Sequence, residues 1–262
     1  MRNFLSLTTA FTFYAGSLLA EAASPIVSSS LSTGWVQHNG QYVSAFELKL
    51  APKWKTYWRV PGDAGIPPEL NFSGSTNVKD VQIIWPRPVP FGPDDMRSLG
   101  YIDGMVLPLY ITPQDPDAPV IVSLSARLGI CEDICIPADL TLQQNLDATR
   151  TRPIPKIVAA LLDVVPDRTD STQAKCRIHP TDSGWRIDAS LRLPNLGAKE
   201  TVVIEYASKD KRVDVQDTRR EGKDLLVTAQ LRDTSGTSLA RNQLTFTLIG
   251  ERKAVSITGC QR

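Results

Sequence analysis

Apolar and polar residues alternate along most of this chain, a pattern typical of half-buried β-strands. Phe46, Leu48 and Leu50, for example, share one face of such a strand. The same period recurs in residues 120–128, 202–206, 226–230, 244–248 and 254–258. Strands of this kind, separated by turn residues at regular intervals, predict an all-β protein built from β-sandwiches.

The segment between Pro155 and Pro166 departs from this period, because its apolar residues recur at helical spacing. They are Ile157, Val158, Leu161, Leu162 and Val165. We expect a short helix inside a linker over residues 151–167. The linker would join a first sandwich (25–150) to a second (168–262), and the alternative is one continuous sandwich with a helical excursion.

The first 22 residues have the features of a signal peptide. Arg2 supplies a positive charge, residues 4–20 carry none, and Ala20-Glu21-Ala22 is a small-x-small cleavage site. The alternative is a retained membrane anchor. No later segment approaches 18 apolar residues, so we expect no membrane span after cleavage. The mature protein is expected in the periplasm, where disulfides persist.

The charge balance excludes one class of function. With 29 basic and 28 acidic residues, the net charge is +1, whereas a nucleic-acid partner requires a one-signed basic patch. No nucleophile elbow, phosphate loop or metalloprotease helix occurs, and the two histidines leave little for acid–base chemistry. The candidate chemistry therefore lies in the four cysteines.

Cys131 and Cys135 would close a ring of about five residues, which the chain-entropy model values at about 2 kcal/mol. Cys176 and Cys260 would close a loop of about 85 residues, valued at about 4.6 kcal/mol. A bridge that stabilises weakly can open without unfolding the protein. We therefore predict that the first pair is catalytic and the second a structural disulfide. The alternatives are a small structural bridge for the first, and intermolecular pairing or a lone C-terminal thiol for the second.

Glu132 and Asp133 lie between the first two cysteines and are expected to raise their thiol pKa values by like-charge repulsion. A dithiol of this kind is a poor nucleophile, and its disulfide readily accepts electrons from a better one. A copper or zinc site would need His or Met beside the two thiolates. Those residues lie far away in the mature sequence, at His38, His179, Met96 and Met105, so we expect no metal and no cofactor.

Two aromatic segments precede the cysteines. In Trp54–Arg59, strand alternation places Trp54 and Trp58 on one face, as core residues, and Tyr57 on the other. The segment Trp85–Pro93 contains four prolines, which exclude a central strand. It is either a rigid loop that covers a reactive disulfide or a passive connection.

Taken together in order, these motifs resemble the N-terminal periplasmic domain of DsbD-type thiol:disulfide interchange proteins. The resemblance is strongest to the branch linked to suppression of copper sensitivity and covers roughly residues 30–145. Its motifs are Trp54–Arg59, Pro61–Pro67, Trp85-Pro86, Gly100-Tyr101 and Cys131–Pro137. It implies an immunoglobulin-like sandwich whose cysteine pair accepts electrons from a thioredoxin-like protein and passes them to periplasmic clients.

The resemblance also implies a cap loop over the cysteine pair. Residues 86–99 are the candidate, with Phe91 and Tyr101 as covers, and Cys135 is the favoured site of attack. Two features depart from the family pattern. Ala138 stands where a glutamate is expected, and the 262 residues show no segment that we would expect to form the membrane or thioredoxin-like domain of full-length members. We therefore do not expect this chain to draw electrons across a membrane by itself.

The sequence thus predicts two immunoglobulin-like β-sandwiches joined by a short helical linker, acting as a thiol:disulfide oxidoreductase. Its expected partners are a periplasmic or membrane-tethered thioredoxin-like protein and disulfide-bearing clients, in cytochrome c maturation or copper stress. The alternative is a non-catalytic binding module or a copper-responsive adaptor.

Overall fold

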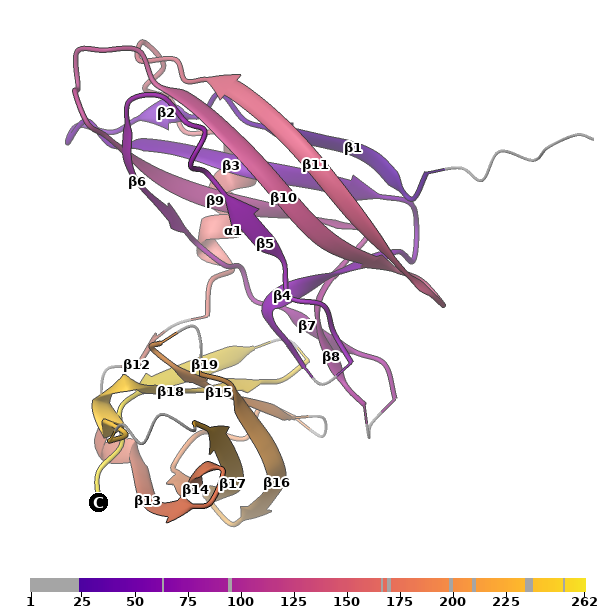
Figure 1. Ribbon diagram of the computed structural model, residues 1–262, viewed down its shortest axis with the longest axis vertical. Helices are drawn as coiled ribbons and strands as arrows, with labels where there is room; N and C mark the ends of the chain where they lie inside the picture. Colours follow the sequence, from indigo (N-terminus) through magenta and orange to yellow (C-terminus); the bar gives the residue numbers. More distant parts are fainter. Residues whose placement is uncertain are drawn as a thin grey trace, which may run out of the picture.

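The computed structural model describes residues 24–262, apart from 63, 94–95, 166, 169–170, 198–199, 209–210, 234–237 and 252 (Figure 1). The predicted signal peptide, residues 1–22, lies outside the described residues. The described part is an all-β structure with a single α-helix, as the alternating pattern predicts. Its strands form four sheets in two pairs, which we call the N-terminal and C-terminal sheet pairs.

The N-terminal sheet pair contains the first eleven strands. One sheet has the order β1-β3-β9-β6, with β2 also on β3; its strands are β1 (Ile26–Leu31), β2 (Trp35–Val36), β3 (Tyr42–Leu50), β6 (Val78–Ile83) and β9 (Gly104–Pro113). The other has the order β11-β10-β4-β8-β7, with β5 also on β10; its strands are β4 (Lys55–Gly62), β5 (Glu69–Asn71), β7 (Val89–Phe91), β8 (Ser98–Ile102), β10 (Ile121–Cys131) and β11 (Cys135–Asn145).

Alternation along these strands forms the N-terminal core. On β3 the predicted face of Phe46, Leu48 and Leu50 is buried. On β10 the even-numbered residues from Val122 to Leu128 are buried in the same cluster. Trp58 is fully buried there and Trp54 packs against the cluster half-buried, so both indoles lie at the core as predicted.

The C-terminal sheet pair forms a second core. One sheet has the order β12-β19-β18-β15; its strands are β12 (Asp167–Arg168), β15 (Thr201–Tyr206), β18 (Leu244–Ile249) and β19 (Ala254–Thr258). The other has the order β13-β14-β17-β16; its strands are β13 (Ala174–Thr181), β14 (Gly184–Leu191), β16 (Val213–Glu221) and β17 (Asp224–Arg232). Two 3-10 turns, Ser171–Gln173 and Arg241–Gln243, complete it.

Helix α1 (Pro155–Leu162) lies between the two sheet pairs in the sequence, where the apolar spacing predicts a helix. It begins at a proline, whose missing N–H is harmless at the first helical position. Ile157 is fully buried against Trp35 and Val43, so the helix packs on the N-terminal sheet pair. Leu162, one of the residues that suggested the helix, is 82% exposed because it lies off this packed face.

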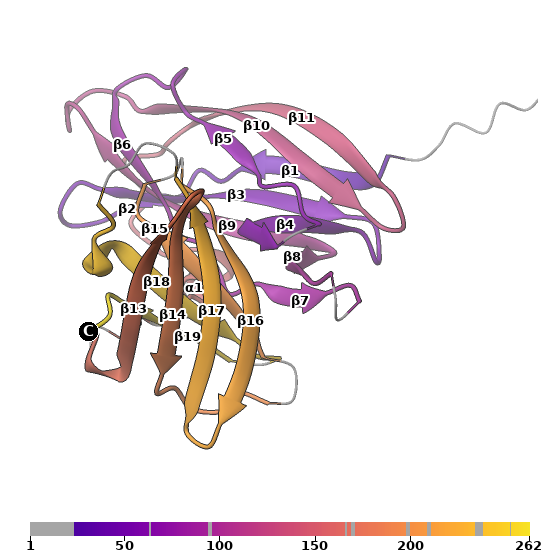
Figure 2. The ribbon, with the colours of Figure 1, turned by 60° about the horizontal axis from the view of Figure 1, so that its bottom comes forward.

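The two sheet pairs lie end to end, with β4, β7 and β8 next to the sheet of β15, β18 and β19 (Figures 1 and 2). Val203, Ile249 and Ala254 of the C-terminal sheet pair belong to the N-terminal core cluster. The two predicted sandwiches therefore share an apolar boundary, and their division into separate domains at residues 150 and 168 stays a prediction.

Candidate redox site

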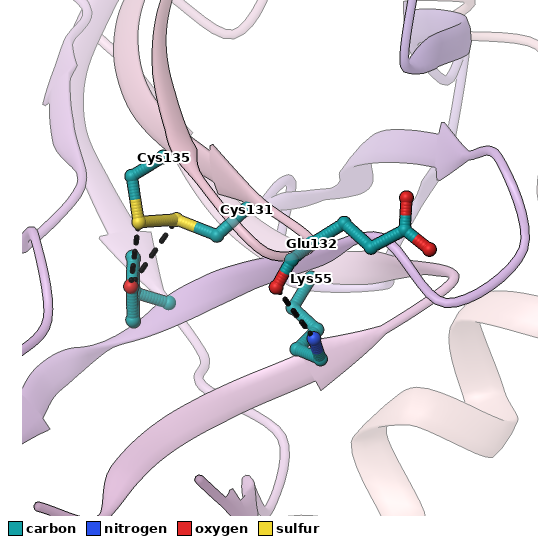
Figure 3. Close-up of a disulfide and its surroundings, with 5 residues drawn as sticks. Lys55, Cys131, Glu132 and Cys135 are labelled. Atoms are coloured by element: carbon teal, nitrogen blue, oxygen red, sulfur yellow. Dashed lines mark hydrogen bonds between the residues drawn. A yellow bond between two sulfur atoms is a disulfide. The ribbon is translucent and has the colours of Figure 1, made fainter.

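Cys131 and Cys135 lie at the tip of the longest hairpin of the described structure. Strands β10 and β11 pair without interruption from Ile121 opposite Asn145 to Cys131 opposite Cys135. The chain reverses over residues 132–134, so the register itself places the cysteines face to face, with Cα atoms 4.1 Å apart. A disulfide joins them (Figure 3).

The two halves of this disulfide have different exposure. Cys131 is only 5% exposed, because its strand β10 also pairs with β4, where it lies opposite Lys55. Cys135 is exposed, because it begins β11 at the edge of the sheet. An incoming thiolate therefore has better access to Cys135 than to Cys131.

The hydroxyl of Tyr57 lies beside both sulfurs, 3.2 Å from Cys131 Sγ and 3.3 Å from Cys135 Sγ. Neither sulfur of a disulfide carries a hydrogen, so the phenol is the donor. Burial raises the pKa of Tyr57 above its ordinary value of 10, which keeps the hydroxyl protonated at neutral pH. A fixed donor thus points at the bond that exchange would break.

Two glycines make room for the Tyr57 ring. A Cβ on Gly129 of β10 would lie 3.1 Å from Tyr57 Cε2 and 2.9 Å from Ile66 Cβ. A Cβ on Gly65 would lie 2.9 Å from Tyr57 Cδ1. Because real Cβ contacts are rarely so short, a side chain at either position would displace the ring. The ring of Phe91 completes this packing, with its centroid 5.9 Å from that of Tyr57.

Alternation along β4 places Tyr57 on the face opposite Trp58, but this pattern alone indicates no role for the phenol. The missing information is the pairing of Thr56 with Ile130 and Lys55 with Cys131, which brings β4 beside the cysteine hairpin. Tyr57 is therefore a site residue that the sequence did not predict.

The predicted cover residues occupy different places. Phe91 is half-buried on β7, with its ring against Tyr57 and Lys55 Nζ 5.9 Å from its centroid. Lys55 Nζ also donates to the carbonyl of Glu132, 3.1 Å away (Figure 3). Tyr101 is buried in the N-terminal core and donates to the carbonyl of Pro86 at 2.9 Å, and burial raises its pKa. Phe91 thus lies one ring away from the disulfide, whereas Tyr101 anchors the start of segment 86–99.

Segment 86–99 is itself partly a strand. Val89–Phe91 forms β7, paired with β8 at the edge opposite β11. An edge tolerates proline because one side of the strand needs no N–H donors, and of the four prolines only Pro90 lies within β7. We call residues 86–99 the cap segment from here on.

The surface around Cys135 is both acidic and apolar. Glu132 and Asp133 are exposed beside the disulfide. Ile134 is 70% exposed and Ile136 is exposed to a lesser degree. Among the described residues, no group of three or more His, Cys, Asp or Glu side chains is placed to hold a metal ion.

The second disulfide joins Cys176 on β13 to Cys260 after β19. Both cysteines are buried in the C-terminal core. The backbone N–H of Cys176 donates to the carbonyl of Gln261, so the chain end also pairs with β13. The structural role of this bridge stays a prediction.

Comparison with known proteins relates this geometry to a family. Residues 32–147 match the family described as thiol:disulfide interchange protein DsbD, N-terminal. The match covers most of the N-terminal sheet pair and none of the C-terminal one. The resemblance noted in the sequence is thereby confirmed over the part of the chain that carries Tyr57, the cap segment and both hairpin cysteines.

A solved structure resembles the DsbD-type segment together with the C-terminal sheet pair. The N-terminal periplasmic domain of ScsB from Proteus mirabilis matches with a TM-score of 0.62 and 22% sequence identity, covering 87% of this chain and 91% of that one. At this identity the likeness concerns the fold, which extends over both sheet pairs. The comparison with curated protein sequences gave no match. Across the described residues, no helix has the length and apolar character needed to cross a bilayer.

Proposed function

We propose that this chain is a periplasmic thiol–disulfide exchange protein. The Cys131–Cys135 disulfide accepts two electrons from a thioredoxin-like partner and passes them to disulfide-bearing clients. One observation carries the proposal: the disulfide joins one exposed and one buried cysteine, and a buried phenol donates to it. The match of residues 32–147 to the DsbD N-terminal family supports the same chemistry.

The uneven exposure sets the order of bond changes. A partner thiolate attacks Cys135 Sγ, the Cys131–Cys135 bond breaks, and Cys131 leaves as a thiolate. A buried thiolate is costly unless it accepts a hydrogen bond, and Tyr57 supplies one at 3.2 Å. Because hydrogen bonds to charged groups contribute about 1.5–3 kcal/mol, this donor lowers the barrier to bond breaking.

The second step completes the transfer. The partner's other thiolate attacks the partner sulfur of the mixed disulfide, and Cys135 leaves as a thiolate. The partner is then oxidised to a disulfide, and the cysteine pair holds two electrons and takes up two protons. Reduction of a client runs through the same steps, with Cys135 as the nucleophile and Cys131 as the resolving thiol.

The exposed Glu132 and Asp133 place negative charge on the surface that a partner approaches. Because like charge opposes thiolate formation, the favourable contribution to the departure of Cys131 comes from the hydrogen bond of Tyr57. A periplasmic location is supported by the signal-peptide pattern of residues 1–22 and by the disulfides, which persist in oxidising compartments. The connection to cytochrome c maturation or copper stress rests on the family resemblance.

Trapping tests the order of attack. In the full chain, Cys131→Ser leaves the exposed Cys135 and is expected to accumulate a mixed disulfide with a thioredoxin-like protein that carries a Cys-x-x-Cys motif. Cys135→Ser leaves the buried Cys131 and should trap far less. Equal trapping by both variants would overturn the assignment of Cys135.

A redox titration tests the exchange function itself. Equilibration with defined thiol buffers should give a reduction potential above about −300 mV, because bridges below that value resist reduction and are structural. A lower potential, combined with stoichiometric binding of a partner without exchange, would favour the adaptor function instead.

A further inference from the structure

The outer face of strand β15 contacts the sheet pair that carries the cysteines. Val202 and Ile204 point into the C-terminal core. The alternate residues Thr201, Val203 and Glu205 lie on the opposite face, as strand geometry requires. Val203 belongs to the N-terminal core cluster, so this face is an interface and not a solvated surface.

Polar contacts flank Val203 on both sides. Glu205 receives two hydrogen bonds from Arg59, one from Nε and one from Nη2, each 2.9 Å long. The guanidinium of Arg59 also lies 3.9 Å from the ring centroid of Trp58. At the other end of this outer face of β15, Arg97 Nη1 donates to Thr201 Oγ1 at 3.3 Å. The two-pronged pair with Glu205 fixes both the position and the orientation of Arg59.

Both arginines are close in sequence to residues of the redox site. Arg59 follows Tyr57 by two residues on β4, directly after the buried Trp58 that it contacts, where the pairing of β4 with β8 becomes irregular. Arg97 directly precedes Ser98 of β8, which pairs with Phe91 on β7 and with Gly62 on β4. The outer face of β15 therefore contacts the strand of Tyr57 and also the start of β8, which pairs with the strand of Phe91.

We propose that the C-terminal sheet pair is a positioning unit for the redox site. The outer face of β15 clamps β4 and the start of β8 together, which keeps the Tyr57 hydroxyl at the two sulfurs. Arg59 and Glu205 are positioning residues, because they act through Tyr57 and do not touch the disulfide. The clamp depends on the proposed function in one respect, namely that Tyr57 assists the departure of Cys131.

The rate of disulfide reduction tests the clamp. The full-length chain is mixed with dithiothreitol under native conditions, quenched by alkylation, and the Cys131 and Cys135 peptides are quantified by mass spectrometry. Glu205→Gln keeps the shape of the side chain but weakens the pair with Arg59. We expect reduction about three- to tenfold slower, because a network contact modulates a coupled site by a fraction of a full hydrogen bond.

Glu200→Gln is the matched control. Glu200 also forms a two-pronged pair, with Arg220, but this pair lies inside the C-terminal sheet pair. Its loss should leave the reduction rate unchanged even where it lowers the melting temperature. Exchange of the two charges in Arg59→Glu/Glu205→Arg should restore a rate near that of the parent chain. Amide hydrogen exchange of Val89, Phe91 and residues 98–100 should accelerate in Glu205→Gln and not in Glu200→Gln.

A double-mutant cycle distinguishes the clamp from a purely structural contact. If Glu205 acts through Tyr57, then Glu205→Gln has no further effect on the reduction rate in a Tyr57→Phe background. The clamp would be overturned if Glu205→Gln reduced at the parent rate while Tyr57→Phe was slow. It would also be overturned if the rate effects of the two substitutions multiplied in the double variant. Either result would leave the exchange mechanism standing. A normal rate in Tyr57→Phe would overturn the role of Tyr57 and, with it, a clamp that works through this residue.

Discussion

The two disulfides of this chain are the same bond in opposite surroundings. Cys131–Cys135 closes the tip of a hairpin that its β-ladder already holds together, and one of its residues is exposed. Cys176–Cys260 joins segments 84 residues apart inside an apolar core. Only the first has a hydroxyl donor among its contacts in the described residues. Loop length, exposure and a nearby donor are the three features on which we base the proposed division into a reactive and a structural bridge.

Removal of each bridge should have unequal effects on stability. Cys176→Ala/Cys260→Ala frees a long loop in the unfolded chain and is expected to lower the free energy of unfolding by up to about 4.6 kcal/mol. Cys131→Ala/Cys135→Ala should cost about 2 kcal/mol or less, because the ring is small. Urea denaturation of the two variants measures both values. Equal losses would remove the distinction between the two bridges.

Mild reductant should separate the bridges kinetically. Cys131–Cys135 is expected to react in the folded protein, whereas reduction of Cys176–Cys260 requires at least local unfolding of the C-terminal core. Since opening a core region costs several kcal/mol, the second reaction should be about 1,000-fold slower or more. Alkylation with mass-spectrometric mapping follows each pair, and circular dichroism checks that the fold survives the first reduction. Parallel loss of both bridges would contradict the proposed exchange role.

Loss of the phenol should slow the reactive bridge alone. Tyr57→Phe removes the donor to the departing Cys131 thiolate, and reduction by dithiothreitol should slow about tenfold or more. Tyr110→Phe is the control, because Tyr110 packs in the separate cluster around α1. The rate for Cys176–Cys260 in a partly denatured sample should not change in either variant.

The smallest effect concerns alkaline pH. Burial raises the pKa of Tyr57, so the folded state holds its phenol proton more tightly than the unfolded state. This contribution to stability is complete below the unfolded pKa of about 10 and is lost as the pH rises through the folded pKa. The free energy of unfolding between pH 9 and 11 should therefore fall less steeply in Tyr57→Phe than in the parent chain. Identical slopes would mean that Tyr57 is not buried as described.

Local patterns predicted much of this molecule. Alternation located β3, β10 and β18, helical spacing located α1, and the short cysteine spacing indicated a disulfide that closes a small ring. The missed features depend on contacts between distant segments. Tyr57 reaches the sulfurs only through the pairing of β4 with β10.

The β15 interface was missed for a related reason. A strand that reads Thr201, Val203 and Glu205 on one face resembles a solvated surface. The partners of this face, Arg97 and Arg59, are more than 100 residues away in the sequence. Hydrophobic periodicity and short motifs predict local structure, so neither indicates a contact between such distant residues.

The hairpin ladder also has a consequence for the energy of turnover. We expect Ile130 to remain paired with Ile136 after the neighbouring disulfide opens, because ten further residue pairs of the ladder hold the register. The oxidised and reduced forms would then share one backbone shape, and each cycle would require little reorganisation. A docking protein would then distinguish the reduced hairpin from the oxidised one by the chemistry of its two sulfurs and not by its outline.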